Sequence, residues 1–325
     1  MAAHCENGVT QNLLKFYDKP LSEAMVFGIG SGIFFSYMPF YKLNGVPVVS
    51  FRPMPGMIFK RTAKRLGFKV KSSRYRKKEA AMKAMNRLLD EKIPVGMVVG
   101  VFHLSYFPKA YRFHFNAHNI VVFGREDDSY IISDPIMETP EKLTHEELKR
   151  VRYAQGTYKP RGKMYYITKP TETHDLETAV IKGIKQTCKH MLTIPIPYFG
   201  IKGISTMARH TRKWPEKLGS KKAKKYLGQI VRMQEEIGTG GAGFRFLYAA
   251  FLQEAAEILK NDELLKISEM MTANGDKWRE FAVLTGRIYK ERIPEEGGFE
   301  KAADMLDAIA AKETEIFSKL QKAVS

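Results

Sequence analysis

The sequence predicts an α+β domain followed by an all-helical domain. Before residue 170, short apolar runs rich in β-branched and aromatic residues alternate with turns, which is typical of strands. After residue 170, apolar residues recur with helical spacing, and glycine- or proline-containing breaks separate the runs. We therefore expect a first domain over residues 1–170 and a helical domain over residues 171–325.

The composition is that of an ordinary globular protein, with 325 residues, of which 44% are hydrophobic and 27% are charged. The two cysteines, Cys5 and Cys188, lie far apart and do not form the pattern of a disulfide framework. The first residues lack the basic and then apolar pattern of a secretory signal. We expect a cytoplasmic protein whose thiols stay reduced.

An uncharged stretch over residues 24–41 is long enough to raise the question of a membrane-spanning helix. Gly28, Gly30, Gly32 and Pro39 would interrupt such a helix repeatedly. We therefore predict a buried strand and a glycine turn within a globular fold, and no transmembrane segment.

The elements of the first domain follow from periodicity. We expect strands over residues 95–102, 119–123, 130–132 and 164–168, one helix directly after Cys5, and another over residues 79–91. Thr144 and Glu147 have the spacing of a capping box at the start of a short helix. In the second domain, the predicted helices are Leu176–Leu192 and residues 220–237, 244–259, 262–271, 277–292 and 299–320, with breaks at 194–203 and 238–243.

The formal net charge of +18 is unevenly distributed. Residues 60–78 contain ten basic residues and no acidic residue, and a second basic cluster covers residues 202–225. Such fields attract anionic partners and accelerate their encounter. The charge pattern leaves nucleic acid, an anionic membrane surface, an acidic protein and a merely solubilising surface as alternatives.

Cys5 lies at the start of the first predicted helix. The positive end of a helix dipole favours the thiolate, and the N–H groups of the first turn can help to hold an oxyanion. The alternative is a small buried hydrophobic residue, which is the usual role of a lone cysteine.

His118 and Asp134 provide candidate partners for Cys5. Residues 118–134 are typical of a hairpin that turns around residues 126–128, which would bring His118 and Asp134 together across two strands. A carboxylate so placed orients an imidazole, as in a Cys-His-Asp triad. An Asp-Pro turn and a core histidine are the alternative. The order helix-Cys, strand-His, strand-Asp is that of papain-like folds.

Other motifs indicate less. Residues 28–32 are similar to a phosphate-binding loop but lack its Lys-Ser/Thr, and they favour a close backbone approach instead. His114 and His118 have no zinc-binding context, so we expect no metal. Residues 238–243 are rich in glycine and precede a predicted helix, which is compatible with either an anion site or a flexible connector.

Several of these segments together resemble the butirosin biosynthesis H protein family. In the first domain they are His4-Cys5, residues 21–32, residues 118–124 and Asp134-Pro135; in the second they are residues 240–255 and Trp278. The resemblance implies a papain-like (C39 peptidase-like) cysteine domain followed by a helical domain. It implies an acyltransferase of secondary metabolite biosynthesis, which takes an acyl group from the phosphopantetheine thioester of an acyl carrier protein. The acceptor would be an amine or hydroxyl of a small molecule.

The resemblance assigns the catalytic roles to Cys5, His118 and Asp134. Papain-like enzymes often have an oxyanion glutamine shortly before the nucleophile, but only four residues precede Cys5, so Gln11 or backbone N–H groups would have to serve. We expect the following residues to bind substrate: Gly28, Gly30, Ser31, Gly32, Arg245 and Tyr248. We expect an acidic carrier protein as partner, attracted by residues 60–78, and no nucleic acid.

Three alternatives remain open at this point. The same triad serves a cysteine hydrolase that uses water as acceptor. Removal of residues 1–4 would instead make Cys5 an N-terminal nucleophile. The third alternative is a basic binding protein without catalysis, which the absence of evident RNA-stacking motifs disfavours.

Overall fold

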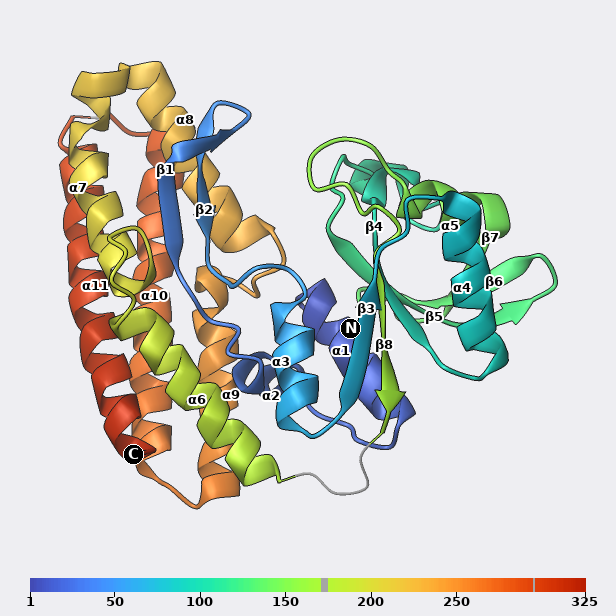
Figure 1. Cartoon of the computed structure of the whole chain (residues 1–325). Coiled ribbons are helices and arrows are strands. Elements are labelled where there is room, and N and C mark those ends of the chain that lie inside the picture. Colours follow the sequence, from blue (N-terminus) through green and yellow to red (C-terminus); the bar gives the residue numbers. More distant parts are fainter. Residues whose placement is uncertain (171–174, 295) are drawn as a thin grey trace. The chain divides into compact units, whose positions relative to one another are not determined.

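The computed structural model describes residues 1–170, 175–294 and 296–325, which divide into two compact units (Figure 1). The first unit combines Met1–Val26 with Ile58–Asp175, and the second combines Phe27–Met57 with Leu176–Ser325. The predicted α+β class is confirmed. Each unit is built from two separate stretches, which differs from the continuous spans 1–170 and 171–325 that the sequence suggested.

A six-stranded antiparallel sheet forms the centre of the first unit, with strand order β3-β8-β4-β5-β6-β7. Four of its strands match the predicted ones. β3 and β7 escaped prediction because they are short edge strands with mostly charged or polar residues. The strands are β3 (Lys69–Ser73), β4 (Val95–Val99), β5 (His118–Glu126), β6 (Ser129–Ser133), β7 (Glu141–Thr144) and β8 (Met164–Lys169).

Helices cover both faces of this sheet (Figure 1). The helices α4 (Lys78–Asp90) and α5 (His145–Arg152) pack on one face, where the apolar stripe of α4 enters the main core. The helices α1 (Cys5–Phe16) and α3 (Met57–Arg65) pack on the other face, where Phe59 contacts Tyr165. The predicted capping box is confirmed, since Thr144 and Glu147 bond each other's backbone N–H groups.

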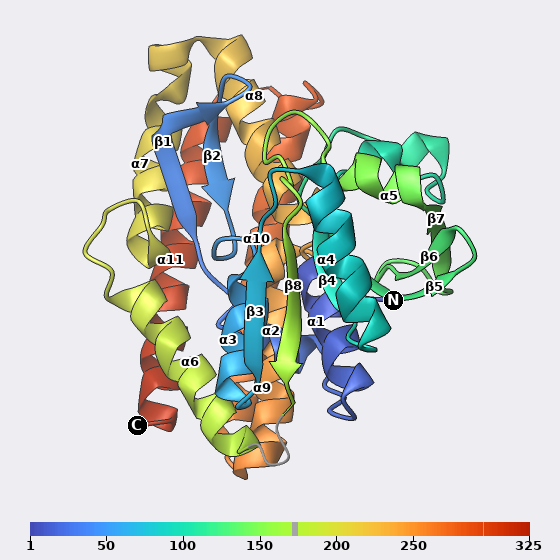
Figure 2. The same cartoon turned by 45° about the vertical axis from the view of Figure 1, so that its right-hand side comes forward.

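The second unit is a bundle of helices that also contains a hairpin of β1 (Ser36–Leu43) and β2 (Val46–Ser50). Figure 2 shows the hairpin beside α7 and α8, which it contacts. The hairpin belongs here because Tyr37 and Phe51 bury their rings against Trp214 and Trp278, contacts that periodicity does not reveal. The helices are α6 (Leu176–Leu192), α7 (Gly200–Leu218), α8 (Ser220–Val231), α9 (Arg245–Leu259), α10 (Glu263–Tyr289) and α11 (Gly298–Ala323).

Three predictions about local structure were wrong. The uncharged stretch begins with a helix, α2 (Glu23–Ile29), and not with a strand, because Ser22 caps it through a 2.9 Å hydrogen bond from Met25 N–H. The predicted break between residues 271 and 277 lies within the continuous helix α10, where Gly275 provides space for the ring of Phe246. The helix α7 starts inside the predicted break at 194–203. Of the helices in the described residues, none has the length and apolarity needed to cross a membrane.

Candidate active site

His118 and Asp134 lie side by side, as the predicted hairpin requires. Strands β5 and β6 pair in antiparallel register from Val121–Ser133 to Glu126–Ser129. His118 and Asp134 therefore lie near each other at the end of the hairpin that is farther from the turn. His118 Nε2 and Asp134 Oδ2 are 2.7 Å apart, and both side chains are buried. Asp134 also accepts hydrogen bonds from the Tyr106 hydroxyl at 2.8 Å and from Ile136 N–H at 3.2 Å. The carboxylate is therefore held in one orientation.

Cys5 is the first residue of α1, and its thiol is partly exposed. Its Sγ lies 3.9 Å from the carbonyl oxygen of Ala117 and 3.6 Å from Asn119 Nδ2, and it also forms a hydrogen bond with His118. The start of a helix carries partial positive charge, which favours a thiolate. Cys5, His118 and Asp134 thus form a connected chain of side chains.

The segment before Cys5 is fixed by backbone hydrogen bonds. Ala2 N–H donates to the carbonyl of Pro135 at 2.8 Å, and the carboxylate of Glu23 accepts from Ala3 N–H and His4 N–H, also at 2.8 Å. Gly8 permits a close approach of α1 to Pro135, because an added β-carbon there would lie 2.3 Å from the Pro135 Cβ. The residue that follows Asp134 thus sets the position of the helix that carries Cys5.

The environment of His118 stabilises its charged form. Burial opposes the imidazolium, but the hydrogen bonds to Asp134 and Cys5 and their negative charges outweigh it and raise the pKa of His118 to about 10. The imidazole is therefore protonated at neutral pH. An imidazolium beside Cys5 favours the thiolate form of that side chain. The second thiol behaves differently, since burial raises the pKa of Cys188 to about 12 and makes it unreactive.

Asn119 is a site residue that the sequence analysis missed. Its Oδ1 accepts a 2.8 Å hydrogen bond from the hydroxyl of Tyr165, whose pKa is raised well above its usual value, chiefly by burial. The amide is thereby oriented with Nδ2 toward Ala117 O and Cys5 Sγ. An amide donor beside a nucleophilic sulfur can stabilise the oxyanion that forms when the sulfur attacks an acyl carbon. The sequence signal that could have identified Asn119 was a polar residue inside a strand of buried residues.

Gln11 is not placed to act as the oxyanion donor. Its Nε2 donates to the carbonyl of Leu21 at 2.9 Å. Six residues along an α-helix correspond to a rotation of about 240°, so Gln11 and Cys5 point in different directions. Asn119 and the first turn of α1 are therefore better placed than Gln11 to donate hydrogen bonds to an oxyanion.

The predicted substrate-binding residues all belong to the second unit. Arg245 is fully buried and forms two hydrogen bonds with Glu313 at 2.9 and 3.0 Å, so its role is structural. Tyr248 is also fully buried. Gly28, Gly30, Ser31 and Gly32 are buried as well; Gly28 accommodates the ring of Phe251, and the Ser31 hydroxyl donates to Gly183 O at 2.9 Å. These contacts explain Gly28 and Ser31 through packing.

No group of three or more His, Cys, Asp or Glu side chains suited to a metal ion occurs in the parts of the chain that the structure describes.

The first unit thus combines an antiparallel sheet with adjoining Cys5, His118 and Asp134 side chains, and the second unit is mainly helical. Residues 4–135 match the family model described as butirosin biosynthesis protein H, N-terminal, and residues 146–320 match a domain of unknown function (DUF4872). The second match covers more than half of the chain, so the chain belongs to the family that carries this domain of unknown function, and its N-terminal domain is like that of butirosin biosynthesis protein H. Among solved structures, a C39-like peptidase from Bacillus anthracis is similar, with 12% identity, a TM-score of 0.36, and coverage of 52% of this chain and 90% of that chain. A search of curated proteins found no match.

The Asp134→Asn substitution should change the pH dependence of Cys5 alkylation. Loss of the carboxylate removes a contribution that raises the pKa of His118, so the imidazolium would lose its proton at lower pH. We expect alkylation by iodoacetamide at pH 6 to slow by roughly tenfold or more, and the profile to shift toward that of an ordinary thiol. Asp128→Asn in the exposed turn of the same hairpin is the control. An unchanged profile in Asp134→Asn would show that Asp134 does not act on His118.

The Asn119→Ala substitution should separate the reactivity of the thiol from the stabilisation of the oxyanion. Loss of an oxyanion donor typically lowers the rate by about 10² to 10³. We expect a loss of this size in acylation of Cys5 by a small thioester, but only a small change in alkylation, which has no oxyanion. Tyr165→Phe should give a smaller loss in acylation, and Asn12→Ala on α1 serves as the control. Equal losses in both reactions would contradict this role.

Proposed function

We propose that the protein is an acyltransferase that moves an acyl group from the thioester of an acyl carrier protein, through acyl-Cys5, to an amine or hydroxyl of a small molecule. The observation that carries the proposal is the contact of Cys5, at the start of α1, with the buried His118–Asp134 pair. The match of residues 4–135 to the N-terminal domain of butirosin biosynthesis protein H supports a biosynthetic acyl transfer.

In the first half-reaction, the Cys5 thiolate attacks the carbonyl carbon of the thioester. The carbonyl oxygen becomes an oxyanion, for which Asn119 Nδ2 and the first turn of α1 supply donors. The tetrahedral intermediate collapses by breaking the bond to the phosphopantetheine sulfur. His118 gives its proton to that sulfur, which leaves as a thiol, and Cys5 keeps the acyl group.

In the second half-reaction, His118 is neutral and acts as the base. It removes a proton from the acceptor amine or hydroxyl as that group attacks the acyl carbon. The bond to Cys5 Sγ breaks, and the sulfur leaves as a thiolate beside the imidazolium, which restores the starting state. Asp134 stays ionised and holds His118 throughout, with help from Tyr106.

A hollow of about 490 Å³ in the first unit favours an acidic partner. Lys60 and Lys64 of α3 and Lys69 and Lys71 of β3 line it, and no acidic side chain does. None of these four lysines makes an ion pair with any described residue. The helix α3 starts where the Glu6 carboxylate accepts from Ile58 N–H and Phe59 N–H, which places this lysine hollow on an element that contacts the residue after Cys5.

Acylation of Cys5 is the direct test of the proposal. After incubation with an acylated carrier protein, the intact mass should rise by one acyl group in the wild type and in Cys188→Ser, but not in Cys5→Ser. Addition of amines should then release the group as an amide. Release only to water would instead identify a hydrolase. Failure of every acyl donor, together with salt-dependent binding of DNA, would contradict the proposal.

Charge reversal in the lysine hollow tests the carrier protein as partner. We expect Lys60→Glu/Lys64→Glu to raise KM for the carrier-bound donor by about tenfold or more at low salt, with kcat unchanged, because steering by opposite charge is lost. The difference should fade at high ionic strength. The control is Lys221→Glu/Lys222→Glu, which makes the same charge change in the second unit. An equal effect of both pairs would contradict docking at the lysine hollow.

A further inference from the structure

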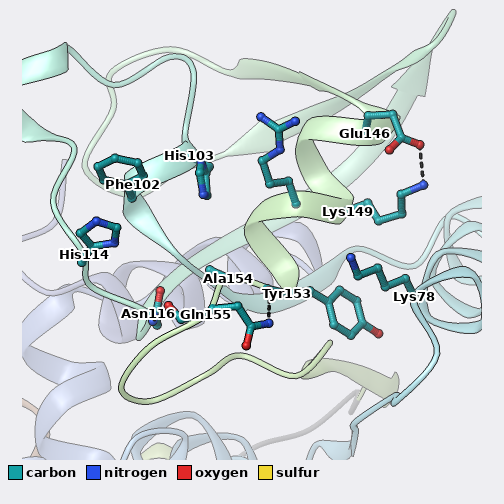
Figure 3. A pocket seen from close by; sticks show the side chains of 11 residues that line it. Lys78, Phe102, His103, His114, Asn116, Glu146, Lys149, Tyr153, Ala154 and Gln155 are labelled. Carbon is teal, nitrogen blue, oxygen red and sulfur yellow. Dashed lines mark hydrogen bonds and ion pairs between the residues drawn. The ribbon is translucent and has the colours of Figure 1, made fainter.

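A second hollow of the first unit, of about 530 Å³, has no assigned role (Figure 3). Its walls come from the start of α4, the turn after β4, the segment before β5, and α5 with the residues that follow it. The volume lies in the range of small-ligand sites. We call it the Arg150 hollow, after the guanidinium that lines it.

The Arg150 hollow carries excess positive charge. Lys78, Lys149 and Arg150 line it, and Glu146 is the one acidic side chain among its lining residues. Glu146 pairs with Lys149, which also contacts Glu79 at 3.3 Å, so that lysine is neutralised. Neither Lys78 nor Arg150 makes an ion pair within the described parts of the chain. Lys78 Nζ lies over the Tyr153 ring, 5.9 Å from its centroid, and the charge of Arg150 acts on the carboxylates of Glu146 and Glu147.

Two histidines add to this environment. The pKa of His103 is lowered, first by partial burial and then by the positive charges of Arg150 and His114. The ring of His114 stacks on that of Phe102, with centroids 4.1 Å apart and planes at 9°. Figure 3 shows this stacked pair beside His103 at one side of the hollow. An apolar platform next to cations suits an anionic group that carries an organic arm.

Residues that line the Arg150 hollow are close in the chain to residues of the candidate active site. The chain that contributes Phe102 and His103 to the hollow continues to Tyr106, which donates to Asp134, and Phe107, whose ring lies 5.7 Å from that of His118. On the other side, Asn116 lines the hollow and directly precedes Ala117, whose carbonyl contacts Cys5 Sγ. Asn116 is itself fixed by hydrogen bonds to Gln155 O and Thr157 O, at 3.0 and 2.9 Å.

We propose that the Arg150 hollow is the subsite for the phosphate of the donor's phosphopantetheine arm. Arg150 and Lys78 bind the phosphate oxygens, and the Phe102–His114 platform contacts the arm as it extends toward Cys5. The inference rests on the proposed acyl transfer and deepens it. It accounts for three cationic side chains around a hollow that has one acidic residue, Glu146, in its lining.

The test compares two donors that differ only in the phosphate. Acylation of Cys5 is followed by mass with an S-acyl-pantetheine and with the matching S-acyl-4′-phosphopantetheine. A charge-assisted phosphate contact should raise kcat/KM for the phosphorylated donor by roughly 10- to 100-fold in the wild type. In Lys78→Met/Arg150→Met this ratio should fall to near one. Lys83→Met, on α4 outside the Arg150 hollow, should retain the wild-type ratio.

Each outcome bears on the subsite separately from the acyl transfer. Equal rates for both donors in the wild type would overturn the subsite and leave the acyl-Cys5 proposal standing. If neither donor acylates Cys5 while iodoacetamide still does, the acyl transfer fails. Binding of 4′-phosphopantetheine, followed by NMR of the His103 and His114 rings, then decides the subsite alone, because no shift at these rings overturns it. A loss with the carrier-bound donor in Lys78→Met/Arg150→Met identifies the carrier's arm as the source of the phosphate.

Discussion

The buried hydrogen bond between His118 and Asp134 constrains the whole of the first unit around the thiol. A carboxylate and an imidazole removed from water are costly unless each is fully bonded. Asp134 meets this requirement with three donors, from His118, Tyr106 and Ile136. His118 completes its own bonding with Cys5. The energetic demand of the pair thus fixes the thiol, the loop that carries Tyr106 and the Asp-Pro turn at the same time.

The position of Cys5 depends on this turn through close packing. Gly8 is the residue of α1 that lies against Pro135, and any larger side chain would push the helix away. Ala2 bonds to the carbonyl of the same proline, and Glu23 holds the next two backbone N–H groups. In the chain as described, residues 1–4 therefore help to orient the thiol through these contacts.

The sequence predicts the triad because its geometry is local. A strand register follows from alternation and a short turn, so the meeting of His118 and Asp134 could be read from the hairpin alone. Asn119 could not be found this way, because its orientation depends on Tyr165 in β8, a strand distant in sequence. The expectation that Arg245 and residues 28–32 bind substrate stays a prediction, and their buried packing contacts could not be foreseen for a related reason. Buried ion pairs and glycines at helix contacts have the same residue types as ligand sites, and the difference between them lies in the partners that the fold brings together.

The same distinction clarifies the large positive charge. In the second unit, Arg212 is paired with three carboxylates of α11, from Glu300, Asp304 and Asp307, so this part of the basic cluster is satisfied by the fold. In the first unit, the lysine hollow is lined by four lysines and by no acidic residue, and the Arg150 hollow by three cations and one acidic residue. Charges of one sign gathered without compensation cost folding energy through mutual repulsion. Their concentration in the unit that holds Cys5 supports the proposal of an anionic ligand for that unit.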